Sequence, residues 1–297
     1  MRIIFIIGGI LTLLSCNDME QTPLEEAMNS DAWVRKVAND PVHEVQIIYT
    51  RISRDSLQRP SFKSYTFNLD TTKYFYPAST AKFPVALLAL ERLNELNIDS
   101  LDKNSSMITD SAYSGQTSVV ADTTSETGLP SIAHYIRKLF IVSDNDAYNR
   151  LYEFLGQDYI NQKLTEKGYT DTRICHRLSI PLSEEQNRHT NPIRFYEDTT
   201  LVYEQPAREA SRSYKASEPI LKGEGYYQGD SLIQKPFNFQ SKNAFPLDEQ
   251  HRMLKAVMFP EHVQKNATFN LTRDDYEFLH YCMHTLPRES IHPSYDS

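Results

Sequence analysis

The chain has 297 residues and a formal net charge of −8, and 40% of its residues are hydrophobic. This length suits one large domain or two interleaved subdomains, and the apolar content is ample for a core. The negative charge argues against nucleic acid as a partner. Nine glycines and fifteen prolines leave no room for long flexible linkers.

The first sixteen residues are typical of an export signal. Met1 and Arg2 supply one positive charge, and residues 3–14 form an apolar run too short to span a membrane. The run ends in Leu-Leu-Ser-Cys at Cys16, which resembles a bacterial lipobox, in which the cysteine is lipidated and becomes the mature N-terminus. We therefore expect a lipoprotein signal peptide at 1–16 and a lipid anchor on Cys16, which would hold the protein at a bacterial membrane on the periplasmic or cell-surface side. The alternative is an ordinary signal peptide with a chance cysteine.

A short helix and a hairpin follow this segment. Residues 17–40 read as a polar tether and then an N-terminal helix over 24–37, whose apolar residues lie near one face. Residues 43–52 are rich in β-branched side chains and predict a strand. Residues 61–70 alternate aromatic and polar side chains, so we expect them to pair with that strand as an antiparallel hairpin.

A serine and a lysine three residues apart stand at the start of an apolar helix, which we expect over 79–96. Lys82 lies on the same face of that helix as Ser79, so its amine can serve as a base for the serine hydroxyl if burial lowers the amine's pKa. Unpaired N–H groups at a helix start also suit a developing oxyanion. Pro84 lacks the N–H that would bond the carbonyl of Thr80, so a locally bent helix start is expected.

The Ser-x-x-Lys pattern is short, and Ser79 could simply cap the helix. A second copy, Ser100 to Lys103, lies in a polar stretch that looks like a turn. Only the copy at Ser79 follows an expected strand and opens a long helix, which favours Ser79 and Lys82 as catalytic residues.

A second motif, Ser143-Asp144-Asn145, occurs once, between helices expected over 132–142 and 147–154. The segment before them, 97–130, is polar and is expected to be loop with short helical pieces. Ser-x-x-Lys followed by Ser-Asp-Asn is the ordered signature of class A β-lactamases and penicillin-binding proteins, and from about residue 41 onward the sequence resembles this family of serine hydrolases.

The resemblance implies an α/β fold of the α+β type, in which helices flank an antiparallel sheet and a second subdomain is all-helical. It implies that Ser79 is the nucleophile and Lys82 its base, and that Ser143 relays a proton to the leaving nitrogen. It also implies that Asn145 bonds the substrate's side-chain amide and helps to hold Lys82. Tyr113 falls where such families often place an aromatic at the pocket rim, although a surface tyrosine is the alternative.

The sequence departs from the class A pattern after the second motif. Class A enzymes carry a glutamate in a Glu-x-x-Leu-Asn pattern that activates the deacylating water, and the alignment puts Leu178 at its place. Glu184 and Glu185 are near in sequence but shifted. Because a base must reach the water directly or through one water, slow deacylation is expected.

The Lys-Thr-Gly or Lys-Ser-Gly motif of the family is not found. Residues 218–230 form a polar insertion rich in Gly and Tyr, and 251–259 and 274–286 predict the helices that precede this motif in the family. The strands that would follow are expected to be missing, so we interpret 41–297 as a serine hydrolase domain that is incomplete at its C-terminus.

These features predict a monomeric hydrolase that acts on a small-molecule β-lactam or a peptidoglycan peptide. The leading hypothesis is a class A type β-lactamase acylated at Ser79. The alternatives are a D-Ala-D-Ala carboxypeptidase or penicillin-binding protein, and a lipoprotein that binds cell-wall peptide without turnover.

No cofactor and no metal site are expected, because the sequence has neither Cys-x-x-Cys nor His-Glu-x-x-His. If Cys16 is lipidated, Cys175 and Cys282 remain. They could pair in an oxidising compartment or stay as buried free thiols, and the sequence leaves both open.

Overall fold

The computed structural model describes residues 21–295 and divides the chain into two compact units, Met1–Leu69 and Asp70–Ser297. Cys16 lies outside the described residues. Within the described range no helix is both long enough and apolar enough for a bilayer span.

The first unit contains two short helices and a hairpin. They are α1 (Pro23–Asn29), α2 (Ala32–Asn39), β1 (Ile47–Arg54) and β2 (Pro60–Phe67). The antiparallel pairing of β1 with β2 confirms the predicted hairpin. The prediction of one helix over 24–37 is wrong, because Asp31 is extended and its carboxylate accepts hydrogen bonds from Trp33 N and Val34 N, which starts a new helix.

The core of this unit is small. Within residues 21–69 its buried apolar residues are Leu24, Met28 and Ala38, and partly buried side chains such as Ile47 and Phe67 pack against them. Few apolar contacts therefore hold this unit together.

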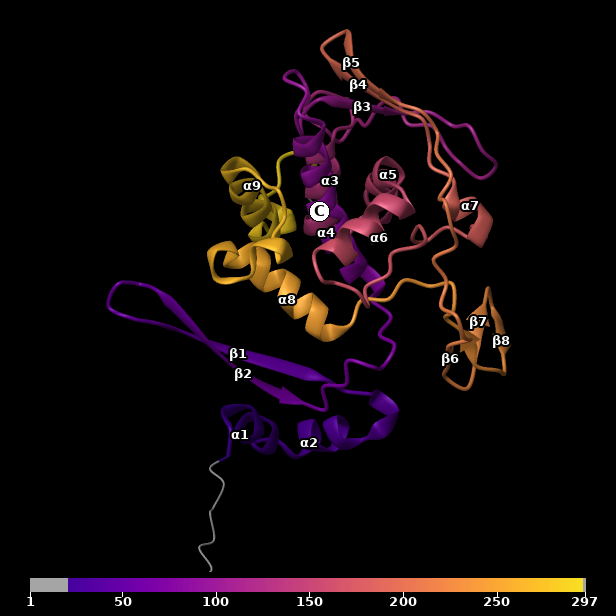
Figure 1. Ribbon diagram of the computed structural model, residues 1–297. Helices are drawn as coiled ribbons and strands as arrows, with labels where there is room; N and C mark the ends of the chain where they lie inside the picture. The colour runs from indigo at the N-terminus through magenta and orange to yellow at the C-terminus, as the bar shows by residue number, and fades with distance from the viewer. Residues whose placement is uncertain (1–20, 296–297) are drawn as a thin grey trace, which may run out of the picture. The chain divides into compact units, whose positions relative to one another are not determined.

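The second unit is built around packed helices, which Figure 1 shows at its centre. Its helices are α3 (Lys82–Leu96), α4 (Ile132–Val142), α5 (Asn145–Leu155), α6 (Gln157–Glu166), α7 (Glu184–Arg188), α8 (Leu247–Met258) and α9 (Arg273–His284). Helices α3, α4 and α5 contact one another, and α4 also contacts α9. The helices expected over 132–142, 147–154, 251–259 and 274–286 are confirmed, whereas α6 and α7 were not predicted.

Helix α3 is buried on almost every side. Its residues from Val85 to Leu90 are at most 1% exposed, as the sequence pattern of an all-round apolar helix indicates. A helix enclosed in this way gives its first turn a fixed position, which matters because Lys82 stands there.

The second unit also contains strands that the sequence did not predict. Strands β3 (Ser106–Thr109), β4 (Ile193–Glu197) and β5 (Thr200–Gln205) form an antiparallel sheet in the order β3-β4-β5. Strand β3 lies in the segment that was expected to be loop. The sequence did not predict it because a strand of four residues carries little local signal and its partner β4 lies far along the chain. The mixed helices and antiparallel sheets are those of an α/β protein compatible with a β-lactamase-like fold.

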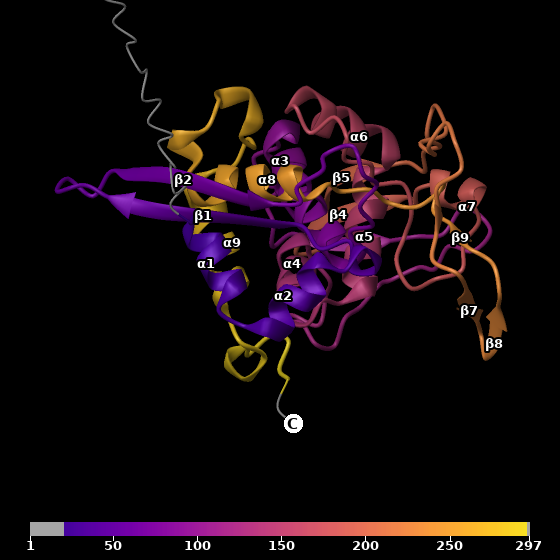
Figure 2. The same ribbon diagram turned by 90° about the horizontal axis from the view of Figure 1, so that it is seen from below.

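Two short ribbons occupy the polar insertion and the residues after it. Strand β6 (Leu221–Lys222) pairs with β9 (Phe237–Asn238), and β7 (Tyr226–Gln228) pairs with β8 (Ser231–Ile233). Figure 2 shows α7, β7, β8 and β9 along one edge of the second unit. After α9 the described residues contain a 3-10 turn, Pro287–Glu289, and no strand.

The two cysteines of the second unit are free thiols. Cys175 and Cys282 are both buried, and burial raises the pKa of the Cys175 thiol to about 11 and that of Cys282 to about 12. The free-thiol alternative is therefore confirmed for these two residues.

Candidate active site

A 3-10 turn over Ala78–Ala81 presents Ser79, and α3 begins only at Lys82. Ala78 has a φ of 46°, a left-handed backbone that is uncommon for alanine. The prediction that the helix runs from Ser79 is therefore wrong by three residues. Pro84 is the third residue of α3, where a backbone N–H has no partner in the helix, so its ring costs no helical hydrogen bond.

Lys82 is 2% exposed, whereas Ser79 is exposed. The Lys82 amine lies 3.3 Å from Ser79 Oγ, 2.9 Å from Ser143 Oγ, 2.5 Å from the Ser143 carbonyl oxygen and 2.7 Å from Asn145 Oδ1. The structure thus brings together four of the predicted site residues. We call Ser79, Lys82, Ser143 and Asn145 the Lys82 cluster.

The corner between α4 and α5 places Ser143 and Asn145. Ser143 has a φ of 58° and ends α4, with its N–H bonded to the Lys138 carbonyl. Asp144 then begins α5, since its carboxylate accepts a hydrogen bond from Ala147 N at 2.8 Å. The tight turn between the two capped helices therefore fixes the positions of Ser143 and Asn145.

The number of acceptors around Lys82 bears on its protonation. A protonated amine has three N–H donors, and four oxygens surround this one. A neutral amine has two N–H donors. The Ser143 carbonyl and Asn145 Oδ1 can only accept hydrogen bonds, so they would take these two N–H groups. Its lone pair then remains for a hydroxyl proton of Ser79 or Ser143.

The electrostatics of the cluster favour the neutral form. Burial lowers the pKa of Lys82, and the nearby Asp144 carboxylate partly opposes this by raising that pKa. Lys138 partly neutralises the negative charge of Asp144, because its amine lies 3.7 Å from the Asp144 carboxylate. The same amine lies 3.1 Å from the Asp122 carboxylate. The net effect on the pKa of Lys82 is downward.

Ser179 belongs to the site and was missed by the sequence reasoning. Its Oγ accepts a hydrogen bond of 2.7 Å from Asn145 Nδ2, which orients the amide so that Oδ1 faces Lys82. Ser179 has a φ of 58° and follows Leu178, the residue aligned with the missing glutamate. No motif marks it, and only the fold brings it to Asn145.

The loop after Leu178 places no carboxylate on the Lys82 cluster. Leu178 is 7% exposed, and its backbone is bonded in both directions to the Asn149 amide. Glu184 contacts Lys215, Ser213 and Ser241. Glu185 contacts Arg188 and His189.

Tyr113 is not joined to the Lys82 cluster by any interaction within residues 21–295. Its ring stacks on His189 with centroids 3.6 Å apart, and its N–H donates to Gln116 Oε1. The rim position expected for Tyr113 remains a prediction.

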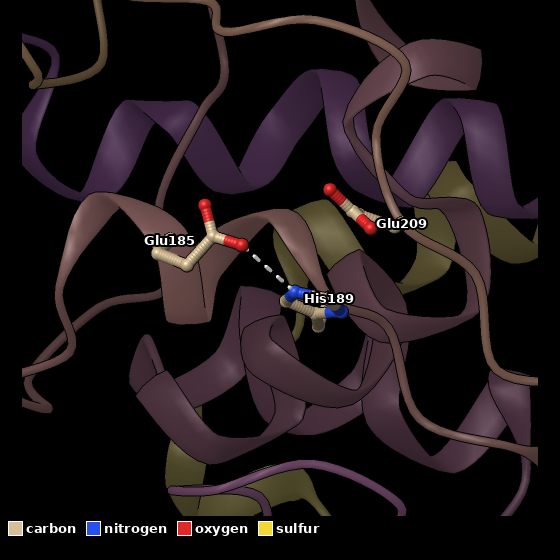
Figure 3. Close-up of side chains that lie close together, drawn as sticks. All are labelled: Glu185, His189 and Glu209. Atoms are coloured by element: carbon tan, nitrogen blue, oxygen red, sulfur yellow. Dashed lines mark hydrogen bonds and ion pairs between the residues drawn. The ribbon is translucent and has the colours of Figure 1, made fainter.

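Three potential metal ligands meet beside this tyrosine. Figure 3 shows Glu185 and His189 joined by a hydrogen bond of 3.1 Å, with the Glu209 carboxylate nearby. Ligand atoms of the three residues lie within 4.8 Å of one another. However, the Arg188 guanidinium already pairs with Glu185 at 3.0 Å and with Glu209 at 2.6 Å, so a cation would have to displace it.

A family model described as the beta-lactamase enzyme family matches residues 35–214, and the chain therefore belongs to this family. The match includes the whole Lys82 cluster. Membership supports a serine hydrolase function of the β-lactamase type and a small-molecule substrate. A comparison with curated proteins found no match.

Proposed function

We propose that this chain is a serine hydrolase of the class A β-lactamase type, which opens β-lactams through an acyl-enzyme on Ser79. The observation that supports the proposal is the buried Lys82 amine in contact with two hydroxyls and an amide oxygen. A buried amine that contacts the nucleophile is the arrangement that activates a serine at neutral pH.

In the first step, neutral Lys82 accepts the proton of Ser79 Oγ, and the oxygen attacks the lactam carbonyl. The backbone N–H of Ser79 donates to no oxygen within residues 21–295, so it is available to the oxyanion. When the C–N bond breaks, Ser143 gives its proton to the leaving nitrogen and regains one from Lys82, 2.9 Å away. This leaves an ester on Ser79 and a neutral Lys82.

Hydrolysis of that ester requires a base for water, and here the chain differs from class A enzymes. Leu178 occupies the aligned position, and neither Glu184 nor Glu185 contacts the Lys82 cluster. We therefore propose that deacylation is slow. This supports a second candidate function, a D-Ala-D-Ala peptidase or penicillin-binding protein.

The test uses soluble protein that begins after Cys16, incubated with a fluorescent penicillin and followed by intact mass from minutes to hours. We expect an adduct of one penicillin that persists, and no adduct with Ser79→Ala. A transient adduct with product release would indicate an efficient β-lactamase instead. No adduct from folded protein would contradict both candidate functions and favour a lipoprotein that binds cell-wall peptide without turnover.

We further propose that Cys16 carries a lipid that anchors the protein to a membrane, on the periplasmic or cell-surface side, as a monomer. The support is the sequence around Cys16. Fractionation of cells expressing the full chain tests it, because Cys16→Ser should move the protein out of the membrane fraction. Light scattering of the soluble protein should give the mass of one chain.

A further inference from the structure

The hairpin of β1 and β2 carries positive charge in an otherwise acidic protein. Residues 47–67 hold four basic side chains and one acidic one, so their net charge is +3 within a chain whose net charge is −8. The basic residues, all of them exposed, are Arg51, Arg54, Arg59 and Lys63. They lie in the half of the hairpin next to its turn, which Figures 1 and 2 show projecting beyond α1 and α2.

Two of these cations face each other across the hairpin without a counter-charge. Arg51 and Lys63 are partners in the register of β1 and β2. Like charges directly opposite one another destabilise a sheet. Within residues 21–295 neither side chain pairs with a carboxylate, and the Lys63 amine lies 5.2 Å from the centroid of the Tyr65 ring. An anion outside the chain would supply the missing counter-charge.

The turn of the hairpin is ordered and presents an apolar side chain. The Asp55 carboxylate accepts hydrogen bonds of 2.9 Å from Leu57 N and from Arg59 N, and it pairs with Arg59 Nε at 2.7 Å. The acid of the hairpin is therefore neutralised inside the turn, whereas the Leu57 side chain is 71% exposed. The Arg54 guanidinium donates to the Gln58 carbonyl at 3.1 Å, so cations stand on both sides of Leu57.

An exposed leucine between cations suits an anionic bilayer better than a soluble polyanion. The negative surface of such a bilayer attracts basic residues that come close to it. The apolar side chain would enter the boundary between the headgroups and the acyl chains. A soluble polyanion would pair with the cations but would offer no apolar surroundings to Leu57.

We propose that the turn half of this hairpin, residues 51–63, docks onto the surface of an anionic bilayer. Leu57 inserts at the level of the headgroups, and Arg51 and Lys63 pair with lipid phosphates. The docking is an interaction beyond the proposed hydrolase function and does not depend on it.

The lipid anchor proposed on Cys16 would keep the hairpin within reach of such a surface. Six residues lead from Cys16 to Thr22, and they span at most about 20 Å. Strand β1 has eight residues and is about 26 Å long, a length of the same order. The anchor and the hairpin would strengthen each other, because the first contact makes the second one intramolecular.

Vesicle sedimentation with soluble protein that begins after Cys16 tests the docking without the lipid anchor. Vesicles of equal parts phosphatidylglycerol and phosphatidylcholine are compared with vesicles of phosphatidylcholine alone. We expect binding to the anionic vesicles only, and weaker binding at high salt. The hairpin accounts for +3 of the net charge of −8, so the rest of the chain carries −11 and would be repelled by these vesicles.

Three variants test the residues of the hairpin. Arg51→Gln combined with Lys63→Gln should raise the lipid concentration at half binding about 25-fold, since each cation near an anionic surface contributes about fivefold. Leu57→Ser should raise it at least about fivefold, because the apolar contact is lost. Arg51→Lys combined with Lys63→Arg keeps both charges and should bind as the wild type does. Circular dichroism checks that each variant is folded.

Matched changes in the second unit serve as controls. Lys235→Gln combined with Lys265→Gln removes the same charge from two exposed lysines, and Leu232→Ser changes a leucine that is 51% exposed. These controls should bind as the wild type does. No binding, equal binding to both kinds of vesicle, or equal losses in hairpin and control variants would each overturn the proposal. A loss with the glutamine variant of the hairpin but not with Leu57→Ser would also overturn it, in favour of a soluble polyanion.

Penicillin labelling of Ser79 in the same samples separates this proposal from the proposed function. Labelling in a protein that does not bind anionic vesicles would leave the hydrolase and reject the docking. Vesicle binding through the hairpin in a protein that is never labelled would leave the docking and reject the hydrolase.

Discussion

At the scale of single residues, the protonation of Lys82 controls the proposed chemistry. Two acceptors without protons, the Ser143 carbonyl and Asn145 Oδ1, take the two N–H groups of a neutral amine and leave its lone pair for a hydroxyl. Burial lowers the pKa of Lys82, so the neutral form appears at a lower pH than for an exposed lysine. The acylation rate should therefore rise with pH and level off before an ordinary lysine has lost its proton.

Lys82→Arg tests this role while it keeps the positive charge. A guanidinium does not lose its proton in proteins, so it cannot accept that of Ser79. We expect the acylation rate to fall by about 10²- to 10⁴-fold, measured as the rate of penicillin labelling. Lys103→Arg is the matched control, since Lys103 ends the other Ser-x-x-Lys pattern and pairs with Asp275 at 3.1 Å. Equal rates for Lys82→Arg and wild type would show that another group accepts the proton.

Asp144→Asn tests the electrostatic coupling to Lys82. The Asp144 carboxylate raises the pKa of Lys82, so its removal should lower that pKa further. Because the neutral amine is the active form, the rise of the acylation rate should shift to lower pH. Asparagine is also a good N-cap, so α5 should keep its start. A shift toward higher pH, with the protein folded by circular dichroism, would contradict the assignment of Lys82 as the base.

At the scale of elements, buried ion pairs hold the base of the loop between Leu178 and His189. Glu153 on α5 pairs with Arg177 at 2.9 Å and with Arg150 at 3.0 Å, and all three side chains are at most 6% exposed. Arg177 also donates to the His189 carbonyl at 2.8 Å, and thus closes the loop onto α5. The loop carries Ser179, so this closure also orients Asn145.

Glu153→Gln should leave the buried Arg177 guanidinium without a counter-charge, whereas Arg150 keeps its ion pair with Asp146 at 2.9 Å. We expect the free energy of unfolding to fall by about 3–5 kcal/mol, measured by urea denaturation. Glu185→Gln makes the same change at a side chain that is 52% exposed, and should cost at most about 1 kcal/mol. A similar small loss for both variants would show that the buried pairs do not stabilise the loop.

Local sequence patterns are sufficient to predict some of these elements and not others. The hairpin β1–β2 has alternating side chains and a short turn, so nearby residues specify it. Helices α4 and α5 have apolar faces, and Ser143-Asp144-Asn145 ends α4 and begins α5, so local sequence specifies them too. The start of α3 was misplaced because Ser79 lies in a 3-10 turn, which sequence periodicity does not separate from a helix. Strand β3 was missed because it depends on pairing with β4.

At the scale of the whole molecule, the two units differ in how much apolar surface they bury. The core of the second unit includes the apolar side chains of α3 from Val85 to Leu90 and Leu93, together with apolar side chains of α4 and α5. Among the described residues of the first unit, 21–69, three apolar residues are buried, Leu24, Met28 and Ala38, beside a two-stranded hairpin. A hairpin with so small a core has little stability of its own.

Hydrogen exchange measured by mass spectrometry should therefore give different amide exchange rates for the two units. We expect amides of α3 and α5 to exchange slowest, and those of β1 and β2 to exchange faster by opening that leaves the second unit folded. Ser79→Ala serves as a control, since it should not change this order. Equal protection of β1 and α3 would show that the two units unfold together.

Local sequence predicted those features of the protein that depend only on residues close together in the chain. The spacing of Ser79 and Lys82 places them on one turn, and Ser143-Asp144-Asn145 at the junction of two helices predicts a corner. The tertiary structure alone decided that this corner meets Lys82, because the contacts join residues 61 and 63 positions apart. It also decided that Ser179 orients Asn145. Such contacts depend on how helices and loops pack, and residue type and local spacing do not encode that packing.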